Sequence, residues 1–157
     1  MSHPYPHTLQ PNGIDYRFTT DYGVSYEAYF TDAEGYFAGA SFAKEAVMFG
    51  LQVIGDERDA VVGLDAGIGA TIAAILEAWL ADHPAGVICY VCNPSDKRPH
   101  QRALRFDRMF WEGNTAGTYS KVDVNRPPLY ASALLRSGNP AKQEIEQAVR
   151  ELVEKFD

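Results

Sequence analysis

A short basic segment carries the residues best suited to bind an anion. Residues 97–108 hold five of the 14 basic residues of the chain and a single acidic residue. Arg98, Arg102 and Arg105 follow one another at intervals of four and three residues, which places them on one ridge of a helix. Guanidinium groups bind phosphate or carboxylate through paired hydrogen bonds, and the start of a helix adds a positive potential. The spacing predicts a site for a small phosphorylated or carboxylated ligand.

Asp96 and His100 lie beside these arginines and would add acid–base chemistry. Histidine titrates near neutral pH and transfers protons, and a neighbouring carboxylate can fix the orientation of its ring. His100 and Asp96 are therefore the candidate catalytic residues. The competing interpretation is that the arginines pair with carboxylates of the same chain. The whole chain carries a charge of −7 and residues 97–108 carry +4, so the remainder carries −11.

Two other motifs favour a structural interpretation. Cys89 and Cys92 form a CxxC pair, but they lie in an apolar run where residues three apart point to opposite faces of a strand. A redox pair needs both sulfurs at the head of a helix, so two buried core thiols are predicted instead. Residues 61–71 (VVGLDAGIGAT) look like the first phosphate loop of actin-like ATPases and sugar kinases. The helical spacing that follows Ile68 favours glycines that bring a helix close to a sheet.

The composition is that of a single globular domain. The chain has 157 residues, of which 46% are hydrophobic and 22% charged, so disorder is not expected. Its negative charge disfavours nucleic acid and anionic lipid as partners. The longest apolar stretch, residues 66–80, contains Glu77 and is shorter than a membrane span. The first residues lack a signal-peptide pattern, so a cytoplasmic protein with reduced thiols is expected; no metal or cofactor motif is present.

Alternating hydrophobicity predicts that the N-terminal half consists of strands. Residues 1–13 hold three prolines and an Asn-Gly pair and are expected to form a flexible arm. Two alternating runs, residues 14–19 and 24–30, are predicted as strands, and residues 47–54 are predicted as a further strand. The first two form a hairpin, because Gly23 can adopt the positive φ of its turn. Residues 36–40 are expected to form a short strand or a bend.

The C-terminal half is predicted to mix helices with strands. Helical spacing is found between Asp65 and Pro84, over residues 99–112, and from Pro140 to Phe156. Strands are predicted over residues 86–92, 119–124 and 129–136. The first of them is apolar on both faces, as a buried central strand should be. Asn139 is expected to cap the last helix, and His83 to contact carbonyl groups at the end of the first.

Because strands cluster at the start and do not alternate strictly with helices, the predicted fold class is α+β. The expected architecture is a mostly antiparallel sheet of about six strands, with three helices packed mainly on one face. No linker or repeat divides the chain, so residues 1–157 are expected to form one domain.

The sequence resembles a family of small, uncharacterised bacterial proteins that carries a domain-of-unknown-function label. The resemblance covers residues 16–156, and its most specific part is a Tyr-x-Cys…Asp…Arg…Phe run. The matching residues are Asp65, Ile68, Thr71, Ile72, Ile75, Leu76, Tyr90, Cys92, Asp96, Arg102, Phe106, Phe110, Tyr130, Leu134, Asn139 and Pro140. The family implies no activity, cofactor or substrate, but it draws attention to residues 90–110.

Two functional hypotheses follow from the sequence. The first is a non-catalytic protein-interaction or regulatory module, similar to an immunity protein, since no assembled catalytic set accompanies this small acidic domain. Its partner would be another protein or a second copy of the chain. The alternative is an enzyme or sensor that binds a small phosphorylated or carboxylated ligand at residues 96–105. Mimicry of nucleic acid by acidic residues of the last helix is disfavoured, because basic residues are interspersed among them.

Overall fold

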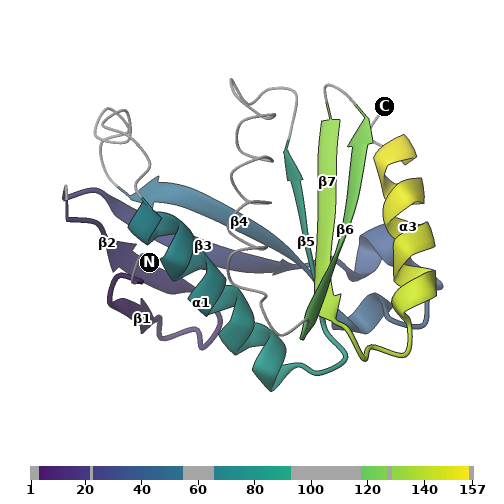
Figure 1. Cartoon of the computed structure of the whole chain (residues 1–157), viewed down its shortest axis with the longest axis horizontal. Coiled ribbons are helices and arrows are strands. Elements are labelled where there is room, and N and C mark those ends of the chain that lie inside the picture. The colour runs from purple at the N-terminus through teal and green to yellow at the C-terminus, as the bar shows by residue number, and fades with distance from the viewer. Residues whose placement is uncertain (1–3, 22, 55–65, 93–117, 127–128, 156–157) are drawn as a thin grey trace.

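One sheet runs through the molecule (Figure 1), and the computed structural model describes residues 4–21, 23–54, 66–92, 118–126 and 129–155. Within these residues, seven strands lie in the order β1-β2-β3-β4-β5-β7-β6. Neighbouring strands are antiparallel except β4 and β5, which are parallel. The strands are β1 (His7–Leu9), β2 (Tyr16–Thr19), β3 (Ser25–Asp32), β4 (Ala46–Ile54), β5 (Val87–Cys92), β6 (Tyr119–Arg126) and β7 (Leu129–Arg136). The helices are η1 (Glu34–Phe37), η2 (Ala43–Glu45), α1 (Ala66–Asp82) and α3 (Lys142–Lys155).

The predicted hairpin near the N-terminus is confirmed. β2 and β3 pair from Tyr16 opposite Ala28 to Thr19 opposite Ser25. Gly23, in the connecting turn, has a φ of 82°, a left-handed conformation that glycine adopts without steric cost. The alternating apolar residues of both strands face the same core, as a period of two requires.

The N-terminal residues add a strand that the sequence pattern did not indicate. β1 lies within residues 1–13, where a flexible arm was predicted, and pairs with β2 from His7 opposite Phe18 to Leu9 opposite Tyr16. Its three residues are too few to show an alternation. This strand makes the sheet larger than the six strands expected from the sequence.

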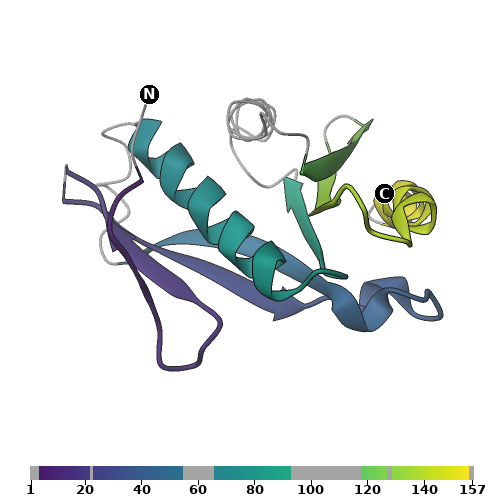
Figure 2. The same cartoon turned by 60° about the horizontal axis from the view of Figure 1, so that its bottom comes forward.

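β5 separates two hydrophobic cores, because its side chains alternate between the faces of the sheet. Ile88 and Tyr90 belong to the core that contains the apolar residues of α1. Val87 and Cys89 belong to the core that contains the apolar residues of α3. Figure 2 shows α1 lying across the side of β1 to β4, and α3 beside β6 and β7.

The prediction of helices mainly on one face is therefore wrong for the two α-helices that are described. A central strand that is apolar on both faces needs cover on both, so α1 and α3 lie on opposite faces. The third predicted helix, over residues 99–112, lies outside the described residues.

The connection between β3 and β4 is helical where a short strand or bend was predicted. η1 covers residues 34–37 and is followed by Gly39, whose φ is 87°. Ser41 then donates two hydrogen bonds to Glu144 Oε1 of α3, from its backbone N–H (2.8 Å) and from its hydroxyl (2.5 Å). These bonds lower the pKa of the Glu144 carboxyl, since they stabilise its ionised form. They hold the connection against α3.

Both predicted helix-end contacts are confirmed. Asn139 Oδ1 accepts a hydrogen bond from the Ala141 N–H at 2.9 Å, which caps the start of α3. At the end of α1, His83 Nδ1 lies 2.8 Å from the Trp79 carbonyl oxygen. The imidazole also stacks on the Trp79 ring, with centroids 4.1 Å apart. The end of α1 is thus closed by an aromatic stack and a side-chain hydrogen bond.

Candidate functional site

The sequence-predicted anion site is not among the described residues. Asp96, Arg98, His100, Arg102 and Arg105 all lie in residues 93–117, outside the described part of the chain. Their grouping, and the choice between an open anion site and internal pairing, stay predictions.

Cys89 is a core residue rather than a reactive thiol. Its side chain is buried between β5 and α3. Burial raises the pKa of the Cys89 thiol to about 12, because an ionised sulfur would lose its hydration. The side chain of Cys92 lies outside the described residues, so the predicted burial of both thiols is confirmed for Cys89 alone.

We expect Cys89 to resist thiol reagents in the folded protein. With a pKa of about 12, only about one thiol in ten thousand is ionised at pH 8, and the thiolate is the reactive form. In a Cys92→Ser variant, a colorimetric disulfide reagent at pH 8 should label less than a tenth of the chains in an hour. Full labelling should follow in denaturant. Stoichiometric labelling of the native variant would contradict the burial of Cys89.

The threonine of the glycine-rich stretch has a structural role. Thr71 lies in α1 and is fully buried. Its hydroxyl donates to the Gly67 carbonyl oxygen at 2.6 Å and accepts a hydrogen bond from the Tyr5 N–H at 2.7 Å. The stretch continues as a helix, not as the second strand of a kinase-type phosphate loop, which favours the structural interpretation. Asp65 lies outside the described residues.

The parallel strands β4 and β5 separate halfway along their length. They pair only from Ala46 opposite Val87 to Met48 opposite Cys89. β4 then continues to Ile54, with its other edge paired to β3 as far as Ser25. Figure 1 shows the two strands diverging from this point. The edge of β4 over residues 50–54 therefore faces β5 without a described strand beside it.

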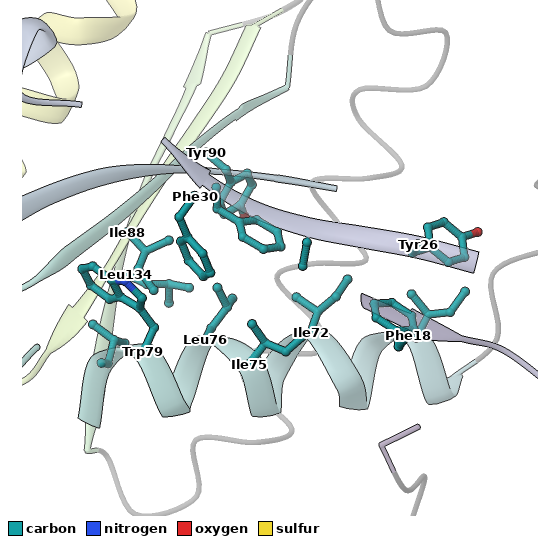
Figure 3. Packing of buried hydrophobic residues seen from close by; sticks show 14 of the residues in the cluster. Phe18, Tyr26, Phe30, Ile72, Ile75, Leu76, Trp79, Ile88, Tyr90 and Leu134 are labelled. Atoms are coloured by element: carbon teal, nitrogen blue, oxygen red, sulfur yellow. The ribbon is translucent and has the colours of Figure 1, made fainter. Parts of the chain in front are cut away.

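Helix α1 joins the two halves of the sheet across this divergence. In a strand–helix–strand unit the helix runs opposite to both strands, so α1 begins near the carboxyl end of β4. Figure 3 shows Phe18 and Tyr26 over the first turns of α1, and Tyr26 pairs with Val53 near the end of β4. Toward the end of the helix, Trp79 packs with Ile88 and Leu134 of the other half.

A row of polar side chains crosses the sheet where β5 leaves β4. Tyr90 of β5 pairs with Ser132 of β7, and Ser132 pairs with Asp123 of β6. The Ser132 hydroxyl donates to Asp123 Oδ1 at 2.5 Å, and Lys121 Nζ lies 2.6 Å from the same oxygen. The Lys121 side chain is only 2% exposed, whereas the Asp123 side chain is 36% exposed. The row lies on the face that α1 covers, since Ile88 and Leu134 share it.

Sequence reasoning missed this row because its members are far apart in the chain. Lys121 and Asp123 alternate with apolar residues of β6, which is typical of a strand with one solvated face. Only the strand pairing shows that this face meets Ser132 and Tyr90. The hydroxyl of Ser132, in the mostly apolar run of β7, is the one sequence signal that could have indicated this row.

No protein-family model matches the sequence, and no curated protein is significantly similar to it. The resemblance to small bacterial proteins therefore stays a prediction. Among the described residues, no helix has both the length and the apolar character needed to cross a bilayer. A function must be argued from the geometry of the diverging strands and the polar row.

Proposed function

We propose that the protein binds a thioester of coenzyme A type between β4 and β5 and transfers its acyl group. The observation that carries this proposal is the divergence of two parallel strands inside the sheet after Met48 and Cys89. Ligands of open sheets bind at the carboxyl ends of parallel strands, where neighbouring strands separate. β4 and β5 are the only parallel pair among the described strands.

The edge of β4 suits a ligand that contains amide groups. A strand edge presents alternating N–H and C=O groups, which bind an extended chain through main-chain hydrogen bonds. From Met48 to Ile54 this edge covers seven residues, which span roughly 20 Å at the rise of a strand. The pantetheine arm of coenzyme A is an extended chain with two amides, and its length is comparable.

The taper of the divergence favours this arm over a peptide. Adjacent paired strands lie roughly 4.8 Å apart, so a full peptide strand between them needs twice that spacing along its whole length. β4 and β5 are still paired at Met48 and Cys89, so the space narrows to nothing there. A chain with few substituents fits such a taper better than a peptide with a side chain on every residue.

The start of α1 suits the phosphates at the other end of such a ligand. Helix N-termini carry a positive partial charge and bind phosphate. Gly67 lies in the first turn, where a missing side chain permits close approach. In this proposal the start of α1 binds the phosphates, and β4 and β5 hold the thioester near Tyr90.

This proposal belongs to the enzyme-or-sensor hypothesis drawn from the sequence, because the ligand is phosphorylated. Transfer would join the acyl carbon to an acceptor nucleophile, break the carbon–sulfur bond and leave the thiol of coenzyme A. The protein-interaction hypothesis predicts a different occupant of the same edge, namely a peptide strand. The experiment below separates the two.

Gly67→Glu should weaken binding of coenzyme A at least tenfold without unfolding the protein. A carboxylate in the first turn repels phosphate, but it interacts favourably with the positive end of the helix dipole. Replacing glycine within a helix also raises the stability of the helix by up to about 1 kcal/mol. Gly67→Ala is the matched control: it adds a methyl group without a charge, so it should weaken binding of coenzyme A less than Gly67→Glu does. Wild-type protein with coenzyme A at 100 times the Kd should gain about 2.7 kcal/mol of stability, or roughly 8 °C in Tm.

Hydrogen exchange locates the ligand. Amides of residues 50–54 should gain protection with acetyl-coenzyme A but not with ADP, which lacks the pantetheine arm. Absence of any thermal shift or protection with acetyl-coenzyme A would refute the proposal. Protection of the same amides by peptides, and not by acetyl-coenzyme A, would support the protein-interaction hypothesis instead.

A further inference from the structure

We infer that Asp123 anchors the acyl acceptor through a hydrogen-bond donor that the acceptor carries about 10 Å from its reacting nucleophile. This inference rests on the proposed function and names the chemistry of its second substrate. It is carried by the geometry of one carboxylate, whose two oxygens have different surroundings.

Within the described part of the chain, the two oxygens of Asp123 differ in their hydrogen bonds. Oδ1 accepts hydrogen bonds from Ser132 Oγ at 2.5 Å and Lys121 Nζ at 2.6 Å. Oδ2 accepts no hydrogen bond from the residues that the structure describes, and the Asp123 side chain is 36% exposed. An ionised carboxylate has about four acceptor positions, so a ligand that donates a hydrogen bond finds a vacant one.

The two partners of Asp123 make this acceptor rigid. Ser132 is 6% exposed and pairs with Asp123 across the β6–β7 ladder. The Lys121 side chain, two residues along β6 on the same face, is 2% exposed. A charged group that is preoriented by buried neighbours costs little reorganisation when a ligand binds. Hydrogen bonds to a charged group of this kind are stronger than those between neutral groups.

The position of Asp123 indicates which ligand it would contact. It lies two strands from Tyr90, the first residue of β5 beyond its last pair with β4. Two strand spacings amount to roughly 10 Å, which is too far for direct contact with a thioester held between β4 and β5. A group bound at Oδ2 therefore belongs to the distal end of the acceptor, on the same face of the sheet.

The class of acceptor follows from what Asp123 can accept. The Asp123 carboxylate already accepts hydrogen bonds from Lys121 Nζ and Ser132 Oγ, and carboxylate oxygens accept hydrogen bonds but donate none. The acceptor must therefore supply a donor, either an ammonium or a hydroxyl. An acceptor with an alkyl group at that end would leave Oδ2 without this bond.

Three acceptors of equal length test the inference with acetyl-coenzyme A as donor: 1,8-diaminooctane, 8-amino-1-octanol and octylamine. Release of the free thiol gives kcat and KM. The wild type should show a KM at least tenfold lower for the diamine, the amino alcohol or both than for octylamine. Asp123→Asn should abolish that preference while leaving the Kd of acetyl-coenzyme A unchanged.

Ser132→Ala is a second variant, which tests the inference independently if Asp123→Asn fails to fold. It keeps the charge of Asp123 and removes one orienting donor, so it should raise KM for the preferred acceptor about threefold to tenfold, within the cost of one hydrogen bond. Equal KM values for all three acceptors in the wild type would overturn the inference, as would transfer to none of them by a protein that binds acetyl-coenzyme A. Failure to bind acetyl-coenzyme A would instead refute the proposed function.

Discussion

Replacing Gly86 by alanine should lower the free energy of unfolding by about 3 kcal/mol, the upper part of the range for overpacking a core. The added Cβ would lie inside van der Waals contact with the Trp79 ring and 2.9 Å from the His83 carbonyl oxygen. Contacts this short force the neighbouring atoms to move. The loss of stability depends on whether those atoms can shift without breaking other contacts.

Neither neighbour of Gly86 moves easily. The Trp79 ring is stacked between Phe30 and His83, with centroid distances of 5.8 and 4.1 Å. The His83 carbonyl accepts the Gly86 N–H at 2.8 Å and belongs to the turn that leads from α1 into β5. Gly86 is thus required because the end of α1 packs directly on the backbone that starts the central strand.

Urea denaturation of Gly86→Ala measures this cost. Gly138→Ala is the matched control, since no atom lies within 4 Å of its added Cβ and its φ is not left-handed. We expect the control to change stability by less than 0.5 kcal/mol, as surface substitutions do. In a Trp79→Leu variant, Gly86→Ala should lower the free energy of unfolding by less than it does in the wild type, because the effects of substitutions at contacting residues are not additive. Equal stability of Gly86→Ala and wild type would contradict the packing described here.

Replacing Ile75 by alanine should have a comparable effect, about 3–4 kcal/mol, through the loss of buried surface and the cavity left behind. Ile75 is fully buried at the middle of α1. Figure 3 shows its side chain between Ile72 and Leu76, directed at the sheet. The core around it contains residues from both sides of the β4–β5 divergence, so the substitution weakens the contact that joins the two halves.

Thermal unfolding of Ile75→Ala should show a Tm about 10 °C below that of the wild type, given roughly 3 °C per kcal/mol for a chain of this length. Ile75→Val removes one methylene group and should cost about 1 kcal/mol. Glu77→Ala, at an exposed position of the same helix, should change stability by less than 0.5 kcal/mol. A cost for Ile75→Ala as small as that of Glu77→Ala would show that α1 does not hold the two halves together.

Local patterns predicted most of the secondary structure correctly. The alternation of β2 and β3 and the turn glycine Gly23 specify a hairpin, and the pairing confirms it. Likewise, Asn139 before Pro140 specifies the start of α3, because a capping oxygen and a fixed φ act over two or three residues. Features of this kind depend on near neighbours in the chain, so a single sequence reveals them.

The errors share a different origin. β1 was missed because three residues carry no period, and its strand character comes only from pairing with β2. The prediction that the helices lie mainly on one face was wrong. β5 is apolar on both faces, so a helix is needed to bury each face of the sheet. In each case the deciding interaction joins segments that are distant in sequence.

For function, the sequence by itself determined the types of residue available, their charge and the local elements that carry them. It singled out Asp96, His100 and the arginines around them, which lie outside the described residues. Only the tertiary structure decided that β4 and β5 run parallel and then separate, and that Lys121, Asp123 and Ser132 form one cluster. The physical reason is that strand order and register are set by long-range hydrogen bonds and by the burial of two apolar faces, and neither leaves a signal in any short stretch of sequence.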